Sequence, residues 1–152
     1  MKHKLQFGLV FVMLALALVS VVGVQAGRQQ SFYLDWRQVV PSGSGDPNMF
    51  GSGTVDVNPG QGRLCYTLRV IIYPYDWPPT GATIHRAPAG QNGSLVVDLN
   101  PDFGPLGQPE TSGCLAISSS LAHDIQRNPA SYYILVTDNT HPDGAARAQF
   151  SK

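Results

Sequence analysis

Charged side chains are scarce in this sequence. Only 13% of the 152 residues are Asp, Glu, Lys or Arg, about half the usual share in a soluble globular protein. Glu110 is the one glutamate, and the ten basic residues balance the ten acidic ones. Since nucleic-acid binding depends on a positive footprint, this balance gives no case for it. We therefore expect no nucleic-acid partner.

The short motifs that mark common enzymes are missing too. The chain has no Gly-x-Ser-x-Gly, no Gly-rich phosphate loop leading into a helix and no zincin motif. It also has no Cys-x-x-Cys, no internal repeat and no low-complexity segment. A chain of this length allows one domain. We therefore expect a single domain that is not an enzyme and uses no cofactor.

The N-terminus has the layout of a secretory signal peptide. Lys2 and Lys4 are followed by the uncharged stretch Leu5–Val22. Val24 and Ala26 then supply the small or permitted residues of a cleavage site. We expect residues 1–26 to be removed, leaving residues 27–152 as a secreted or periplasmic domain. The alternative is an uncleaved segment that anchors the domain outside the membrane.

Cys65 and Cys114 are the only cysteines, so one intramolecular pairing exists. An oxidising compartment favours the disulfide, which should stabilise the fold by about 4 kcal/mol in the chain-entropy model. Two buried free thiols are the alternative.

Long helices are disfavoured because 16 glycines and 12 prolines punctuate the chain. Alternating apolar and polar residues predict strands instead. A helical turn over Leu121–Gln126, capped by Ser118–Ser120, should end before Pro129. The pattern predicts an all-β fold, a sandwich or partly closed barrel of about eight short antiparallel strands with one short helix. The predicted strands are Ser31–Val40, Gly53–Val57, Arg63–Tyr73, Ala82–Arg86, Ser94–Leu99, Cys114–Ile117, Tyr132–Thr137 and Ala145–Phe150.

Residues 81–99, GATIHRAPAGQNGSLVVDL, resemble the central motif of the CHRD (chordin) domain family. The segments Asn128–Tyr133, Pro142-x-Gly144 and Arg147-x-Gln149-Phe150 resemble its closing pattern, and the similarity covers about residues 30–151. It implies an extracellular or periplasmic β-rich domain. The family is named after an animal antagonist of bone morphogenetic proteins, and its bacterial members are mostly single-domain exported proteins. The positions carried over are His85, Gly90, Gly93, Pro142, Gly144, Arg147 and Gln149.

Two departures from the family pattern bear on metal binding. Thr83 stands where the first His of a His-x-His is usual, and Thr137 replaces a strand His. His85 and His141, with His123, Asp138 or Asp143, are weak candidate ligands for copper or zinc. We expect no stoichiometric metal and a structural role for His85.

Arg147 lies in the middle of a predicted strand and needs a carboxylate or several carbonyls as partners. Asp98 is a candidate partner. The aromatic side chains of Tyr73, Tyr75 and Trp77 form a possible contact surface, or else a small core that covers a sheet edge.

The sequence therefore predicts an exported, non-catalytic binding or structural module. Its partner is an unknown extracellular or envelope protein or carbohydrate. The alternative is a metal-binding (Cu/Zn) or redox β-sandwich protein.

Overall fold

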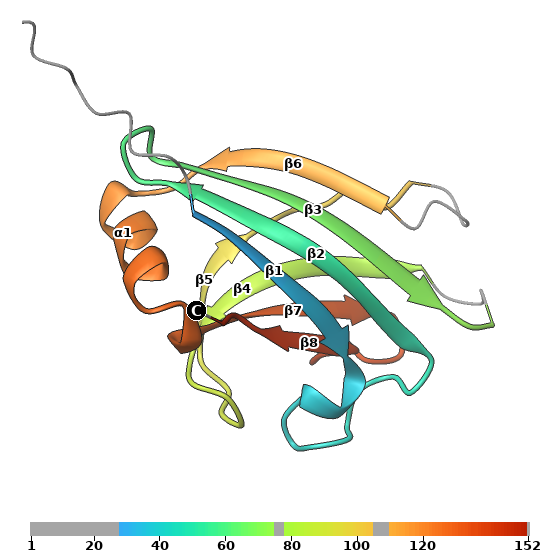
Figure 1. Ribbon diagram of the computed structural model, residues 1–152. Coiled ribbons are helices and arrows are strands. Elements are labelled where there is room, and N and C mark those ends of the chain that lie inside the picture. Colours follow the sequence, from blue (N-terminus) through green and yellow to red (C-terminus); the bar gives the residue numbers. More distant parts are fainter. Residues whose placement is uncertain (1–27, 75–77, 105–109, 152) are drawn as a thin grey trace, which may run out of the picture.

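The computed structural model describes residues 28–74, 78–104 and 110–151. Eight strands form one antiparallel sheet in the order β5-β4-β7-β8-β1-β2-β3-β6, and the sheet curls into a half-barrel (Figure 1). The all-β prediction is confirmed, and the partly closed barrel is the form found. The strands are β1 (Arg28–Asp35), β2 (Met49–Asn58), β3 (Arg63–Ile72), β4 (Pro79–Arg86), β5 (Ser94–Asp98), β6 (Glu110–Ala116), β7 (Tyr132–Asp138) and β8 (Ala146–Gln149).

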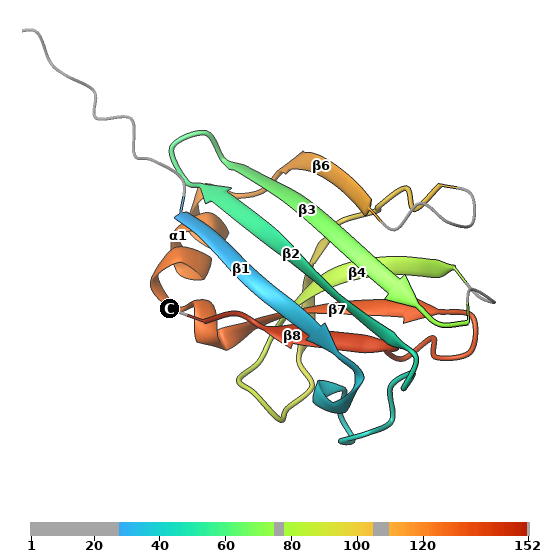
Figure 2. The ribbon, with the colours of Figure 1, turned by 45° about the vertical axis from the view of Figure 1, so that its right-hand side comes forward.

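The pairing between β1 and β8 is the shortest in the sheet. These strands share one registered pair, Asp35 with Arg147, whereas β2 and β3 share ten. The β1–β2–β3–β6 half therefore turns over the β5–β4–β7–β8 half (Figures 1 and 2). The core fills the space between the two halves.

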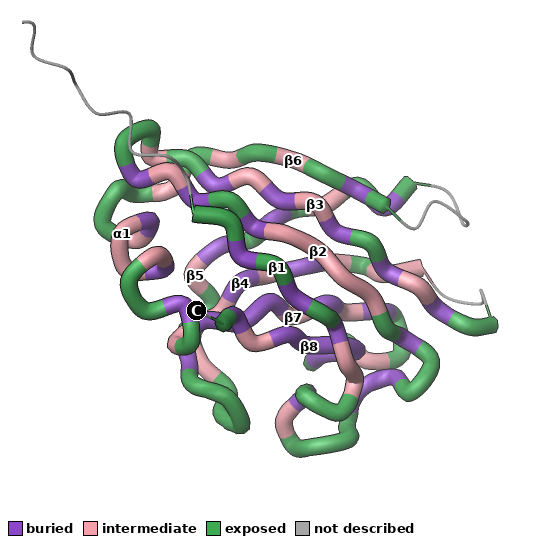
Figure 3. The backbone as a smooth tube through the Cα atoms, viewed as in Figure 1, coloured by how far each residue is buried: buried purple, intermediate pink, exposed green. Residues whose placement is uncertain are grey.

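Alternation along the strands decides which side chains enter this core. In β3, Leu64, Tyr66, Leu68, Val70 and Ile72 are buried, as their spacing predicts. Along β1 and β3, buried positions alternate with exposed or half-buried ones (Figure 3). Helix α1 (Ser119–Arg127) covers one end of the core with Ala122 and Ile125. The hydroxyl of Ser118 caps this helix by accepting from the Leu121 N–H, as predicted.

Several strand boundaries differ from the predicted ones. Strand β1 begins at Arg28 rather than Ser31 and stops at Asp35, because the Asp35 carboxylate accepts from the Arg37 N–H and starts the 3-10 helix η1 (Trp36–Gln38). Strand β2 starts at Met49 rather than Gly53. The glycines in its first half weaken the strand signal in the sequence. Strand β6 starts at Glu110 rather than Cys114, and a second 3-10 helix, η2 (Pro129–Ser131), precedes β7.

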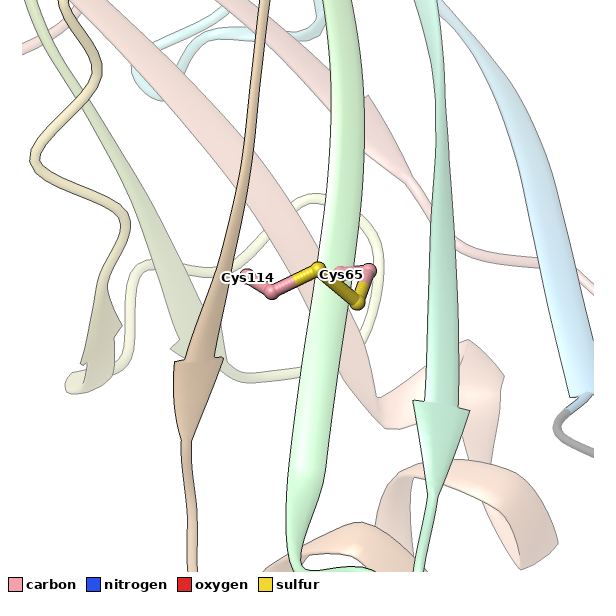
Figure 4. Close-up of a disulfide and its surroundings, with 2 residues drawn as sticks. All are labelled: Cys65 and Cys114. Carbon is pink, nitrogen blue, oxygen red and sulfur yellow. A yellow bond between two sulfur atoms is a disulfide. The ribbon is translucent and has the colours of Figure 1, made fainter.

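Cys65 and Cys114 form the predicted disulfide between β3 and β6 (Figure 4). They are directly opposite in the strand register, with Cα atoms 4.0 Å apart. Cys114 is exposed and Cys65 half-buried, so the bond lies on the outer face of the sheet.

Within the described part of the chain, no helix has the length and apolarity to cross a membrane. The apolar stretch Leu5–Val22 and the proposed cleavage site lie outside the described residues.

Candidate functional site

The outer face of β4, β7 and β8 carries a stack of three side chains. The ring of Tyr133 in β7 lies between β4 and β8 and is only 1% exposed. The His85 ring from β4 stacks on it, with centroids 5.2 Å apart and planes at 14°. The Arg147 guanidinium from β8 lies over the same ring, 3.5 Å from its centroid. A cation over an aromatic face away from water is a favourable contact.

This stack holds the segment that joins β4 to β5. Arg147 donates to the carbonyls of Pro88 and Gln91 and to the Gln149 side chain. The Gln149 amide in turn donates to the carbonyls of Ala87, Ala130 and Tyr132. Burial lowers the pKa of Arg147 from its ordinary value. The prediction that Asp98 pairs with Arg147 is wrong. Backbone carbonyls accept the hydrogen bonds of the arginine, and the Asp98 carboxylate accepts from the Asn100 N–H instead.

Both nitrogens of His85 are engaged in this network. Its Nδ1 lies 3.0 Å from the Gly93 carbonyl oxygen, and a carbonyl can only accept, so Nδ1 carries the proton. Nε2 of a neutral ring then accepts from the Thr83 hydroxyl, 2.9 Å away. The threonine that departs from the family pattern is therefore the partner of the remaining histidine.

Gly90 and Gly93, two of the motif glycines, are required for different reasons. Gly90 has a φ of +77°, in the left-handed region that favours glycine. At Gly93, a Cβ would lie 1.9 Å from the Arg86 carbonyl oxygen, while the Gly93 N–H bonds to the Tyr133 hydroxyl. These contacts show that the central family motif fixes a loop onto the sheet.

The structure does not bring His85 and His141 together. His85 is registered with Tyr133, near the start of β7, whereas His141 contacts Asp138 at the end of that strand, Nδ1 to Oδ1 3.2 Å. Tyr133 and Asp138 are five positions apart along β7, which corresponds to roughly 16 Å. Burial raises the pKa of Asp138, but hydrogen bonds from Thr140 and His141 outweigh it and hold that pKa below its ordinary value. Pro142 and Gly144 shape the turn between His141 and β8.

The aromatic surface predicted after β3 falls partly outside the described residues. Tyr73 is 70% exposed, and its N–H donates to the Asn48 carbonyl. Tyr75 and Trp77 lie outside the described part of the chain, so this surface stays a prediction.

A second polar surface, not identified from the sequence, lies on the outer face of β1, β2 and β3. It is a shallow hollow of about 480 Å³, with Tyr33 projecting from β1 at 80% exposure. The polar residues that recur at every second position, such as Ser52 and Thr54 in β2, are its sequence signal, but the hollow itself depends on strand register. Its lining residues are Ser31, Phe32, Tyr33, Ser52, Gly53, Thr54, Thr67, Arg69 and Glu110.

Comparisons with known proteins agree with the motif geometry. The family model of the CHRD domain matches residues 31–150, which include all of β2–β8, most of β1 and the loop that the motif residues hold. Searches of curated proteins and of solved structures return no match. Because the family model covers nearly the whole described domain, the chain belongs to the CHRD domain family.

Proposed function

We propose that this protein is an exported, non-catalytic recognition module that binds a carbohydrate chain on the hollow of β1, β2 and β3. The observation that carries the proposal is the exposed Tyr33 ring beside a row of hydroxyl side chains. In the strand register, Ser31 is opposite Thr54, and Tyr33 is opposite Ser52. Thr54 is in turn opposite Thr67 in β3, so the hydroxyls form a continuous polar surface.

The chemistry of this surface suits a sugar. Ser and Thr hydroxyls both donate and accept hydrogen bonds, as sugar hydroxyls do. An exposed tyrosine offers an apolar ring face with a polar tip. Arg69 and Glu110, opposite each other in β3 and β6, add a charged donor and a charged acceptor at one side. Protein–protein interfaces are enriched in tyrosine and arginine but depleted of serine, so it is the row of hydroxyls, rather than Tyr33 or Arg69, that favours carbohydrate over a protein partner.

The family motif residues support a role without catalysis. His85, Arg147 and Gln149 are engaged with backbone carbonyls and with neighbouring side chains, so these polar groups position a loop rather than face a cleft. Two of the titratable groups with shifted pKa values, Asp124 and Tyr132, pair with each other. These contacts give the motif residues and this tyrosine–aspartate pair a structural role.

Export is supported by the N-terminal signal layout and by the disulfide. A disulfide fits an oxidising compartment, and CHRD domains are extracellular or secreted. N-terminal sequencing of the processed protein should start at Gly27. Intact residues 1–26 in a membrane fraction would favour an anchor instead.

The carbohydrate proposal is tested by titrating the purified protein with a panel of neutral and acidic polysaccharides. Tyr33→Ala should weaken binding at least about tenfold, which corresponds to the loss of one well-placed aromatic contact. Tyr73→Ala is the matched control, because Tyr73 is also an exposed tyrosine but lies outside the hollow. Binding that survives Tyr33→Ala and fails in Tyr73→Ala or Trp77→Ala would move the site to the segment after β3.

A further inference from the structure

Three potential metal ligands meet at the end of the half-barrel where the β7–β8 turn contacts the segment before β2. Asp46, Asp138 and His141 each offer one ligand atom, and these atoms lie within 4.8 Å of one another. Asp46 and Asp138 are buried and His141 is half-buried. The grouping depends on the fold, since the Asp46 N–H donates to the Ala145 carbonyl and so ties its segment to the turn.

One oxygen of this cluster has no partner. Oδ1 of Asp138 accepts from the backbone N–H groups of Thr140 and His141 and from the Thr140 hydroxyl. Oδ2 of Asp138 is buried and accepts no hydrogen bond, alone among the buried side-chain nitrogen and oxygen atoms of the described residues. The Asp138 side chain is 0% exposed. An unpaired carboxylate oxygen shielded from water is costly, and a cation at this point would satisfy it.

The closeness of Asp46 to Asp138 further favours the binding of a cation. Asp46 is 8% exposed, and its Oδ1 accepts from the Asn48 N–H. Two carboxylates close together away from water repel each other, and a single imidazole offsets at most one charge. A divalent ion between them neutralises both.

The ligand types select the class of metal. Calcium and magnesium prefer sets made of oxygen alone, whereas zinc accepts imidazole nitrogen together with carboxylate oxygen. Three protein ligands leave the fourth zinc position open. A hollow of about 250 Å³ borders Thr140 and His141, and the 28% exposure of the His141 side chain gives the ion a path from solvent.

We propose that Asp46, Asp138 and His141 form a zinc-binding site that clips the segment before β2 to the β7–β8 turn. Its ligands come from two parts of the chain that sequence spacing alone does not relate. Metal binding would stabilise this corner of the half-barrel and leave one coordination position open toward the neighbouring hollow. The site is separate from the carbohydrate surface and does not depend on it. This proposal replaces the expectation, drawn from the sequence alone, that the domain binds no stoichiometric metal.

The test is calorimetric titration of the chelator-treated purified protein with zinc chloride, with Co²⁺ absorption as a second readout of coordination. We expect one equivalent of zinc per chain. A hundredfold excess over Kd should raise Tm by at least about 4 °C. Asp46→Asn and His141→Gln should each weaken binding at least about tenfold, because loss of even an indirect ligand contact costs that much. Asp46→Asn keeps an oxygen that can accept from the Asn48 N–H, so its fold should survive.

Asp143→Asn is the matched control, since Asp143 is an exposed carboxylate in the same turn and lies outside the cluster. It should bind zinc like the wild type. Well under one equivalent of zinc in the wild type would overturn the proposal. So would full zinc binding in both ligand variants, because the metal would then lie elsewhere. Binding of calcium in preference to zinc would overturn the assigned class.

Discussion

Arg147 places its guanidinium 3.5 Å from the centre of the Tyr133 ring while it is 1% exposed. The pair lies outside the main core, on the outer face of the sheet, beneath the segment that joins β4 to β5. A buried cation without a carboxylate is rare. Here carbonyl oxygens, an amide oxygen and an aromatic face replace the carboxylate.

The first prediction concerns this arginine. Arg147→Ala should lower the free energy of unfolding by about 3 kcal/mol or more, because the carbonyls of Pro88 and Gln91 lose a charged donor. Arg147→Lys keeps the charge but not the forked geometry or the stacking, and should cost about 2 kcal/mol. Urea denaturation measures both losses. Arg63→Ala, at an exposed position in β3, should stay within about 0.5 kcal/mol of wild type. An Arg147→Lys protein as stable as the wild type would contradict the role assigned to the planar guanidinium group of Arg147.

The second prediction separates the two motif glycines. Gly93→Ala should destabilise the protein by about 2–4 kcal/mol, since its methyl group overlaps the Arg86 carbonyl and the backbone must move. Gly90→Ala has no atom within 4 Å of its new Cβ, so its cost is only that of a positive φ, about 1–2 kcal/mol. Thermal unfolding of the two variants in parallel checks the order. Equal losses would show that the close contact at Gly93 relaxes freely.

Strands β3 and β2 show how much of the fold could be predicted from the sequence. Strand β3 was predicted almost to the residue because five apolar side chains alternate along it. Residues 49–52 of β2 were missed because Gly51 and Gly53 weaken the strand signal there, although the predicted strand begins at Gly53 itself. In the fold the two glycines lie so close to neighbouring atoms that a Cβ would come within 2.2 Å and 2.4 Å of the Arg69 and Thr67 carbonyl oxygens.

The sites were less accessible to sequence reasoning for a different reason. His85 was predicted to have a structural role, and its contacts with Gly93 and Thr83 agree. Asp138 was considered as a ligand beside His141, but nothing in the sequence places Asp46 next to them. The hollow near Tyr33 likewise exists because three strands align their small side chains in one register. Contacts between distant segments come from topology, which local patterns do not encode.

The third prediction concerns the Cys65–Cys114 disulfide. Its sequence separation of 49 residues corresponds to a loss of about 4 kcal/mol when the bond is removed, if the unfolded chain gains the full loop entropy. Reduction should therefore lower Tm clearly, and the bond is accessible because Cys114 is exposed. The Cys65→Ser, Cys114→Ser double variant should show the same lower Tm with and without reductant. A reduced wild type that melts like the oxidised protein would contradict the entropy argument.

The fourth prediction is acid sensitivity at the end of helix α1. The Tyr132 hydroxyl donates to Asp124, and this bond, followed by one from Asn128, lowers the pKa of Asp124 below its ordinary value. A carboxyl whose pKa is depressed by folding contributes stability above its unfolded pKa, and this contribution is lost as pH falls through the folded pKa. Asp124→Asn should therefore flatten the acid limb of a stability profile below about pH 4. An unchanged acid limb would show that Asp124 does not contribute to the loss of stability at low pH.

The last prediction is the alkaline counterpart in Tyr132, which is fully buried. Burial, and then the hydrogen bond to Asp124, raise the pKa of Tyr132 from 10.0 to about 12. A group whose pKa is raised by folding contributes stability that is present below the unfolded pKa and is lost as pH rises through the folded pKa. Two pKa units correspond to a loss of up to about 3 kcal/mol between about pH 10 and pH 12.

Tyr132→Phe isolates this contribution. Near pH 8 the variant should be less stable than wild type by about 1–2 kcal/mol, because a hydrogen bond to a charged group is gone. As pH rises toward 12 the difference should shrink, since only the wild type has this phenol to deprotonate on unfolding. The pKa of Tyr66 is also raised by burial, so both proteins lose stability in alkali, and the difference between them is the quantity to measure. Urea denaturation across this range provides it, and a difference that stays constant with pH would show that Tyr132 does not titrate with unfolding.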